Sequence, residues 1–187
     1  GPDVGPNVTT ATVLDGVTVT GGNANGSQNE AEGGGLYCDG EGSSNECSPT
    51  LRRIAFTDNS ANFGGAIYND GGALSSGTSS PQITNVTFTG NTAAARSTSA
   101  GGAIYNSGAS SPQITNATFT GNSADDSGGA IFNNNGLSGA SSPQITNATF
   151  TGNSADSGGA IYNSAGFSFP SSPQIINTIL WGNTANN

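Results

Sequence analysis

Short stretches of alternating apolar and polar residues recur along the chain, and each of them predicts a short β-strand. In VTFT (residues 86–89), valine and phenylalanine alternate with two threonines, so the two pairs face opposite sides of a strand. Ile83 breaks this alternation, which predicts a corner in the chain near Asn85. A third short strand is expected at residues 66–68, directly after a Gly-Gly pair. No segment shows the 3.6-residue apolar period of an amphipathic helix.

This pattern is repeated along the chain. Its clearest marker is a Ser-Pro dipeptide whose serine lies at positions 48, 80, 111, 142 and 172, with spacings of 32, 31, 31 and 30 residues. Each unit reads SPQITNxTFTGNxA, then a variable loop, GGAIYN and a second variable loop. Length changes fall only in the two loops, as expected when the strands between them are stacked.

We therefore predict an all-β fold, a parallel β-helix (β-solenoid) of about five to six coils of about 31 residues, with three short strands per coil. The whole chain, residues 1–187, is expected to form one domain. Its expected parts are an N-terminal segment (1–10), a first coil with a cysteine loop (11–47), four repeats (48–79, 80–110, 111–141 and 142–171) and a partial last coil (172–187).

Stacking of the coils places equivalent residues above one another. One predicted internal column is aromatic and consists of Phe56, Phe88, Phe119 and Phe150, ended by Val19 and Leu180. A second is aliphatic and consists of Leu36, Ile67, Ile104, Ile131 and Ile161. Two predicted rows of asparagine are Asn85, Asn116, Asn147 and Asn177, and Asn59, Asn91, Asn122, Asn153 and Asn183. We interpret both rows as ladders of hydrogen-bonded amides, although three members of the first also begin N-x-Thr glycosylation sequences.

The paired motifs GGAI and FxxN resemble the repeat of chlamydial polymorphic outer membrane proteins, and are similar to β-helix repeats in large secreted bacterial proteins. GGAI lies near Gly65 and at residues 101–104, 128–131 and 158–161, and FxxN lies at 56–59, 88–91, 119–122 and 150–153. The resemblance covers about residues 11–187. It implies a right-handed parallel β-helix, a location at the bacterial cell surface and, often, adhesion.

The net charge of the chain limits the classes of partner that it can bind. The chain has three Lys and Arg residues (Arg52, Arg53 and Arg96) against 12 Asp and Glu, and its net charge is −9. Nucleic acids and anionic membrane surfaces require many cations, so neither is an expected partner. No apolar run approaches the roughly 18 residues of a membrane span, and we expect no membrane insertion.

Cys38 and Cys47 flank one Gly/Ser-rich loop, and we predict a disulfide between them. The alternatives are two free thiols or a weak metal site, but the chain has no histidine and no third cysteine to complete a soft ligand set. A disulfide favours an extracellular location.

Few residues are candidates for catalysis or metal binding. The paired carboxylates Asp125 and Asp126 lie in a variable loop, whereas acid–base catalysis needs paired groups on rigid elements, and there is no histidine. We therefore predict that the chain is not an enzyme and needs no cofactor. Structural calcium in a loop is an alternative to simple solvated carboxylates, although the nonapeptide calcium motif is absent.

Two outward rows suggest binding modules. Thr-x-Thr at residues 18/20, 87/89, 118/120 and 149/151 resembles the regular faces of ice-binding solenoids, although threonine is also an ordinary outward strand residue. The aromatic row Tyr37, Tyr68, Tyr105, Phe132 and Tyr162 either contacts glycans or packs under the adjacent loops.

The ends of a β-helix present unpaired strand edges. Leu180 and Trp181 add apolar surface to the last coil, and the stretch from Val8 to Val13 offers a spare strand before the first. We expect a structural or adhesive protein whose partner is a second copy, stacked head to tail into a filament, or the flanking parts of a longer surface protein from which this chain is a segment. The alternative is a glycan- or ice-binding module that uses the outward Thr or Tyr face.

Overall fold

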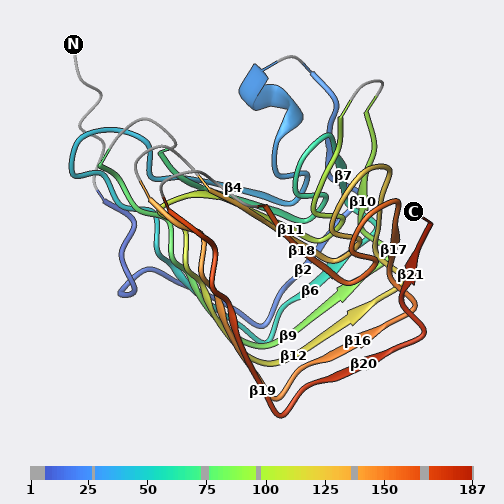
Figure 1. The fold of residues 1–187 in the computed structure, drawn as a ribbon. Helices are drawn as coiled ribbons and strands as arrows, with labels where there is room; N and C mark the ends of the chain where they lie inside the picture. Colours follow the sequence, from blue (N-terminus) through green and yellow to red (C-terminus); the bar gives the residue numbers. More distant parts are fainter. Residues whose placement is uncertain are drawn as a thin grey trace.

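A computed structural model of the chain describes residues 7–26, 28–72, 76–95, 98–135, 139–164 and 169–186. Seen almost along its axis, the chain winds as a right-handed solenoid with the C-terminal coils nearest the viewer (Figure 1). Each coil contributes strands to three parallel sheets, as predicted. Five coils have strands in all three sheets and a sixth has strands in two of them. Arg96, the third arginine of the chain, lies outside the described residues.

The first sheet has ten strands and carries the ITN and TFT segments of the repeat. Its strands are β1 (Val13–Asp15), β2 (Thr18–Thr20), β5 (Thr50–Arg52), β6 (Ala55–Thr57), β9 (Gln82–Thr89), β12 (Gln113–Thr120), β15 (Gln144–Thr146), β16 (Thr149–Thr151), β19 (Gln174–Ile176) and β20 (Ile179–Trp181). The register pairs each repeat residue with its equivalent one coil away, for example Phe119 with Phe88 and with Phe150.

The second sheet follows the GN turn and consists of two-residue strands that the sequence analysis did not single out. They are β3 (Asn23–Ala24), β7 (Ser60–Ala61), β10 (Thr92–Ala93), β13 (Ser123–Ala124), β17 (Ser154–Ala155) and β21 (Thr184–Ala185). The third sheet holds the AIYN segments: β4 (Leu36–Asp39), β8 (Ile67–Gly71), β11 (Ile104–Gly108), β14 (Ile131–Asn134) and β18 (Ile161–Asn163). One 3₁₀ turn, η1 (Gln28–Ala31), lies in the loop of the first coil.

The core is formed by the predicted columns. Phe56, Phe88, Phe119 and Phe150 are fully buried, and the rings of the last three stack with centroids 4.6 and 4.5 Å apart. Ile67, Ile104 and Ile131 are also fully buried and pack in the same cluster. Leu36 and Ile161 lie at the edge of this cluster, in register with that column.

The predicted corner at Asn85 is a left-handed backbone turn. Asn85, Asn116, Asn147 and Asn177 all have φ between 49° and 56°, and Arg53 takes the same conformation in the second coil with φ 53°. Asparagine tolerates this region better than most residues, because its short side chain adds little crowding. The side chains are exposed, and only two amide bonds link them: Asn116 Nδ2 donates to Asn85 Oδ1 at 3.1 Å, and Asn147 Nδ2 donates to Asn116 Oδ1 at 3.3 Å. Conformation is therefore the main reason for asparagine in this row.

The second asparagine row is a buried ladder. Asn59, Asn91, Asn122 and Asn153 are at most 1% exposed, and each donates its Nδ2 to the Oδ1 of the equivalent residue in the next coil at 2.8–3.0 Å. The same Oδ1 atoms accept the backbone N–H of the preceding coil's asparagine. Each amide thus satisfies a turn whose backbone groups would otherwise be buried without partners.

Candidate binding surfaces

A third ladder, not identified in the sequence, lies under the third sheet. Asn69 donates to Asn106, Asn106 to Asn133 and Asn133 to Asn163, each from Nδ2 to Oδ1 at 2.8 Å. The first three residues are fully buried. The signal was present as the last letter of each GGAIYN motif, but alternation alone does not say that an asparagine next to an outward tyrosine points inward and pairs.

The predicted disulfide is present. Cys38 and Cys47 are joined, with their Cα atoms 5.5 Å apart, and both are buried. Cys38 stands on β4 in register with Asn69 of β8, so the disulfide occupies the position that an asparagine holds in the later coils. Among the buried side-chain atoms described, Asn69 Oδ1 is one of the two that have no hydrogen-bond partner.

The aromatic row of the third sheet is packed under the loops rather than open to solvent. Neighbouring rings from Tyr37 to Tyr162 have centroids 4.9–5.5 Å apart. Tyr68 and Tyr105 are only 7% and 8% exposed, because Phe63 and Ala100 from the loops pack against them. Burial raises the pKa of both phenols. This arrangement argues against a glycan-binding face made by the tyrosines, which was one of the two expectations.

A group of carboxylates lies at the N-terminal end of this aromatic row. The Tyr37 hydroxyl donates to Asp70 Oδ2 at 3.4 Å. Burial, helped by repulsion from Asp70, Asp39 and Glu41, raises the pKa of Glu32 to about 7. Within the described parts of the chain, no three Asp, Glu, Cys or His side chains lie close enough to hold a metal ion.

The threonine ranks form an exposed strip on the first sheet. Thr87, Thr89, Thr118 and Thr120 are exposed, and their equivalents in neighbouring coils lie in register with them. Ala55 interrupts one rank, and Ile179 and Trp181 take the threonine positions of the last coil. Their exposures of 62% and 74% make an apolar end to an otherwise polar strip.

Both ends of the solenoid expose residues of the inner columns. Ile175 and Leu180 of the last coil are 43% and 50% exposed, whereas their equivalents Ile145 and Phe150 are fully buried. At the other end Leu14 is 38% exposed and its equivalent Leu51 is 1% exposed. Of the predicted assembly residues at this end, Val13 is exposed, while Val8 is half-buried and pairs with Cys47.

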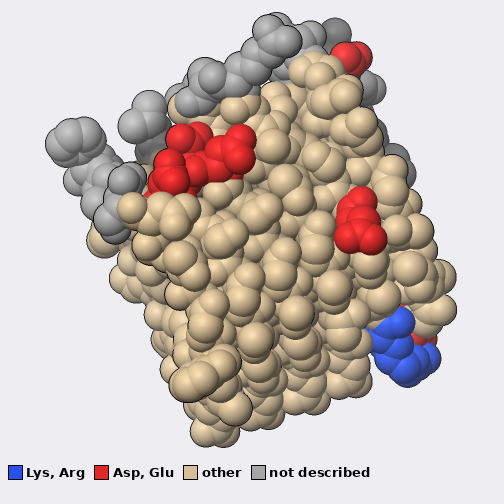
Figure 2. Space-filling model, turned by 90° about the vertical axis from the view of Figure 1, so that its right-hand side faces the viewer, with Lys and Arg blue, Asp and Glu red and all other residues tan. Residues whose placement is uncertain are grey.

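Charged side chains are sparse on the side of the molecule that carries the second sheet (Figure 2). Two of the three arginines, Arg52 and Arg53, both bind the Asp15 carboxylate, at 2.8 and 2.5 Å. Asp125 and Asp126 lie in the loop after β13, and Asp126 Oδ2 accepts the Ser99 N–H at 2.5 Å.

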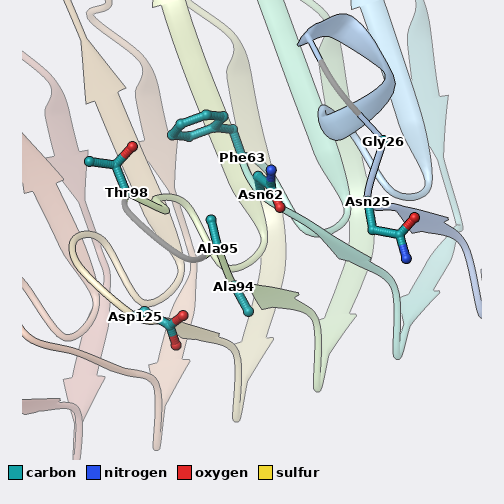
Figure 3. Close-up of a pocket in the computed structure, with 8 residues that line it drawn as sticks. All are labelled: Asn25, Gly26, Asn62, Phe63, Ala94, Ala95, Thr98 and Asp125. Carbon is teal, nitrogen blue, oxygen red and sulfur yellow. The ribbon is translucent and has the colours of Figure 1, made fainter.

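A groove of about 600 Å³ crosses the loops on this side. The loop between the second and third sheets spans residues 25–35 in the first coil, 62–66 in the second and 94–103 in the third, so a short loop lies between two long ones. Figure 3 shows Asn62 of the short loop between Asn25 on one side and Ala95 and Asp125 on the other. The described residues that line the groove are Asn25, Gly26, Asn62, Phe63, Ala94, Ala95, Thr98 and Asp125.

Four segments of the chain match one family model, the Chlamydia polymorphic membrane protein repeat, at residues 53–77, 85–107, 116–134 and 147–164. Each segment contains one FxxN motif and one GGAI motif, the two motifs that carry the resemblance in the sequence. No curated protein and no solved structure matches the chain. In the described residues no helix is long and apolar enough to cross a membrane. The chain is a parallel β-solenoid, and four of its segments match the Chlamydia polymorphic membrane protein repeat.

Proposed function

We propose that this chain is a non-enzymatic structural β-solenoid of a bacterial cell surface, and that it builds a longer rod by stacking head to tail on a second copy of itself. The alternative is that both ends continue into flanking parts of a longer surface protein. The observation that carries this proposal is the exposure of the inner columns at both ends, above all of Ile175 and Leu180. A second copy stacked on these ends would bury the apolar side chains and pair the open strand edges.

The register supports this junction. If the next copy continued the coil spacing, Leu180 would face Val19 and Ile175 would face Leu14, so apolar residues would meet in both columns. The ladder of Asn59 would not continue across the junction, because Gly22 takes the asparagine position in the first coil and has no side-chain amide to accept from Asn183. The proposed junction therefore depends on apolar burial and strand pairing. Such a contact does not close on itself, so it gives filaments.

The location is inferred from two independent features. The matched repeat is named for membrane proteins of Chlamydia, and the Cys38–Cys47 disulfide is typical of compartments outside the cytosol. The sparse cations argue against nucleic acid as a partner.

Sedimentation velocity and negative-stain microscopy test the proposal over a range of concentrations of the intact chain. We expect rods whose lengths are multiples of one molecule. Leu180→Asp places a charge in the junction and should leave monomers, whereas Thr118→Ala changes the exposed strip in a middle coil, away from both ends, and should preserve the rods. An intact chain that stays monomeric at high concentration would refute self-stacking.

A further inference from the structure

Two parallel ranks of threonine follow the outer face of β9, β12 and β16, on the lower side of the molecule in Figure 1. In the third, fourth and fifth coils the ranks consist of Thr87 and Thr89, Thr118 and Thr120, and Thr149 and Thr151. The first four of these side chains are exposed and the last two are half-buried. Their hydroxyls form no hydrogen bond with another described residue, so the fold does not use them.

The strands under these ranks are stacked with almost no twist. Neighbouring strands of a sheet are normally rotated by about 20–25°. In this face a phenylalanine lies between the two threonines of each coil and points inward. The ring planes of Phe88 and Phe119 differ by 5°, and those of Phe119 and Phe150 differ by 1°. The coils are therefore nearly parallel, and the face that they form is flat.

The ranks repeat regularly in two directions. Along the axis, the ring centroids beneath them are 4.6 and 4.5 Å apart. Along each strand, two residues that face the same side are separated by about 6.6 Å. A ligand that contacts every threonine must therefore repeat in two directions at these spacings. A soluble peptide or oligosaccharide repeats in one direction at most, whereas the surface of a crystal repeats in two.

The face is also uncharged, although the chain as a whole has a net charge of −9. Residues 82–91, 113–122 and 144–153, which include the strands and the turns on both sides, contain no Asp, Glu, Lys or Arg. Each threonine offers a hydroxyl, which can both donate and accept a hydrogen bond, and a methyl group, around which water is orientationally restricted. This combination favours a lattice of water molecules as the ligand.

From these observations we propose that the threonine strip binds the surface of ice. The outer oxygen atoms of an ice crystal repeat in two directions at spacings close to those of the two ranks, so several hydroxyls can join the lattice at once. The site is most regular in the third to fifth coils. In the second coil Ala55 interrupts one rank, and in the last coil Ile179 and Trp181 replace both threonines.

This site lies on the side of the solenoid and not at its ends, so it does not depend on head-to-tail stacking. The Leu180→Asp variant, which should be monomeric, is expected to bind ice as well as the parent chain does. Failure of the stacking proposal would leave this result unchanged.

Thermal hysteresis, the gap between the melting point of an ice crystal and the temperature at which it grows, tests the proposal with the intact chain. We expect a measurable gap, faceted crystals and incorporation of the protein into slowly growing ice. Thr118→Tyr should lower the hysteresis at least about fivefold, because a ring that projects from the middle of the strip separates the neighbouring threonines from the ice. Thr115→Tyr is the matched control, since it lies on the same strand but before the corner, and it should leave the hysteresis unchanged.

Three results would overturn the proposal. They are the absence of both hysteresis and incorporation into ice, an equal loss in the Thr115→Tyr and Thr118→Tyr variants, and retention on microcrystalline cellulose by a chain that ice does not take up. Unfolding midpoints establish that each variant is folded. Thr89→Tyr, at an exposed position in the neighbouring coil, gives a second test of the strip if Thr118→Tyr unfolds.

Discussion

Asn69 Oδ1 is buried without a hydrogen-bond donor because Cys38, and not another asparagine, pairs with Asn69 in the preceding coil. The inner ladder of the third sheet therefore ends at the disulfide. Cys38 and Cys47 replace a ladder bond with a covalent bond to the following loop. Mutation can replace the disulfide with an asparagine ladder bond, and the stabilities of the two proteins can then be compared.

We expect Cys38→Ala/Cys47→Ala to lose about 2–3 kcal/mol of unfolding free energy, because a disulfide across so short a loop restricts the unfolded chain only modestly. Cys38→Asn/Cys47→Ala should recover about 1 kcal/mol of this loss, since the new amide can donate to Asn69 Oδ1. Urea unfolding of the two variants measures the difference. Equal stability of the two would mean that the ladder cannot extend into the first coil.

Phe119→Ala should cost about 3–5 kcal/mol, because it opens a cavity in the middle of the stacked phenylalanine column. The neighbouring Thr118 faces solvent, and Thr118→Ala should change stability by less than about 0.5 kcal/mol. Denaturant unfolding gives both values. A neutral effect at Phe119 is incompatible with the column described above.

Asn122→Ala should cost about 3 kcal/mol or more. The change removes the acceptor of the Asn91 N–H and Nδ2 groups and the donor to Phe88 O, and all of these groups are buried. Unfolding by urea, compared with the same change at the exposed Asn116, separates the ladder from general effects of losing an amide.

The corner row should respond to backbone conformation rather than to lost hydrogen bonds. Asn116 has φ 54° and an exposed side chain. Asn116→Gly should be nearly neutral, because glycine adopts positive φ freely, whereas Asn116→Ala should cost about 1 kcal/mol. If both variants lose the same stability, the side-chain bond to Asn85 matters more than the turn.

Stability should fall as the pH rises from about 4.5 to 7 because of Glu32. Its pKa in the folded chain, about 7, is above the ordinary value of 4.5, mainly because the group is buried and also because Asp70, Asp39 and Glu41 lie nearby. Between these two values the folded state binds more protons than the unfolded state, so raising the pH favours unfolding.

Glu32→Gln should remove this part of the pH dependence and should be more stable than the parent chain at pH 8. Urea midpoints measured from pH 4.5 to pH 8 provide the comparison. Asp156→Asn, which changes an exposed loop carboxylate, controls for the loss of one negative charge.

The sequence predicted the strands and columns because a stacked coil must repeat its inward residues in register. The Phe56 to Phe150 column and the Asn59 ladder follow from that rule, and both are present. The disulfide was predicted from two cysteines that flank one loop, and it is present as well. The surfaces were harder to predict. Alternation placed Tyr68 outside, but only the folded loops decide that Phe63 and Ala100 cover it.

The groove could not be predicted from the sequence for the same reason, because it depends on how the loops pack. The unequal loop lengths can be counted in the sequence, but the meeting of Asn25, Asn62 and Asp125 from three coils depends on how each loop leaves its sheet. Likewise, Asn69 and its equivalents lie beside outward tyrosines, and no local pattern distinguishes an inward amide that pairs along the axis from one that faces solvent.

The two buried ladders run in the same direction, since every bond between their amides goes from Nδ2 to the Oδ1 of the next coil toward the C-terminus. Their aligned dipoles give the molecule an acceptor end, where Asn69 Oδ1 stands unpaired, and a donor end, at Asn163 and Asn183. Two molecules that met by identical ends would set like partial charges against each other. The molecule is therefore polar along its axis, and an assembly built from it would have a direction as well as a repeat distance.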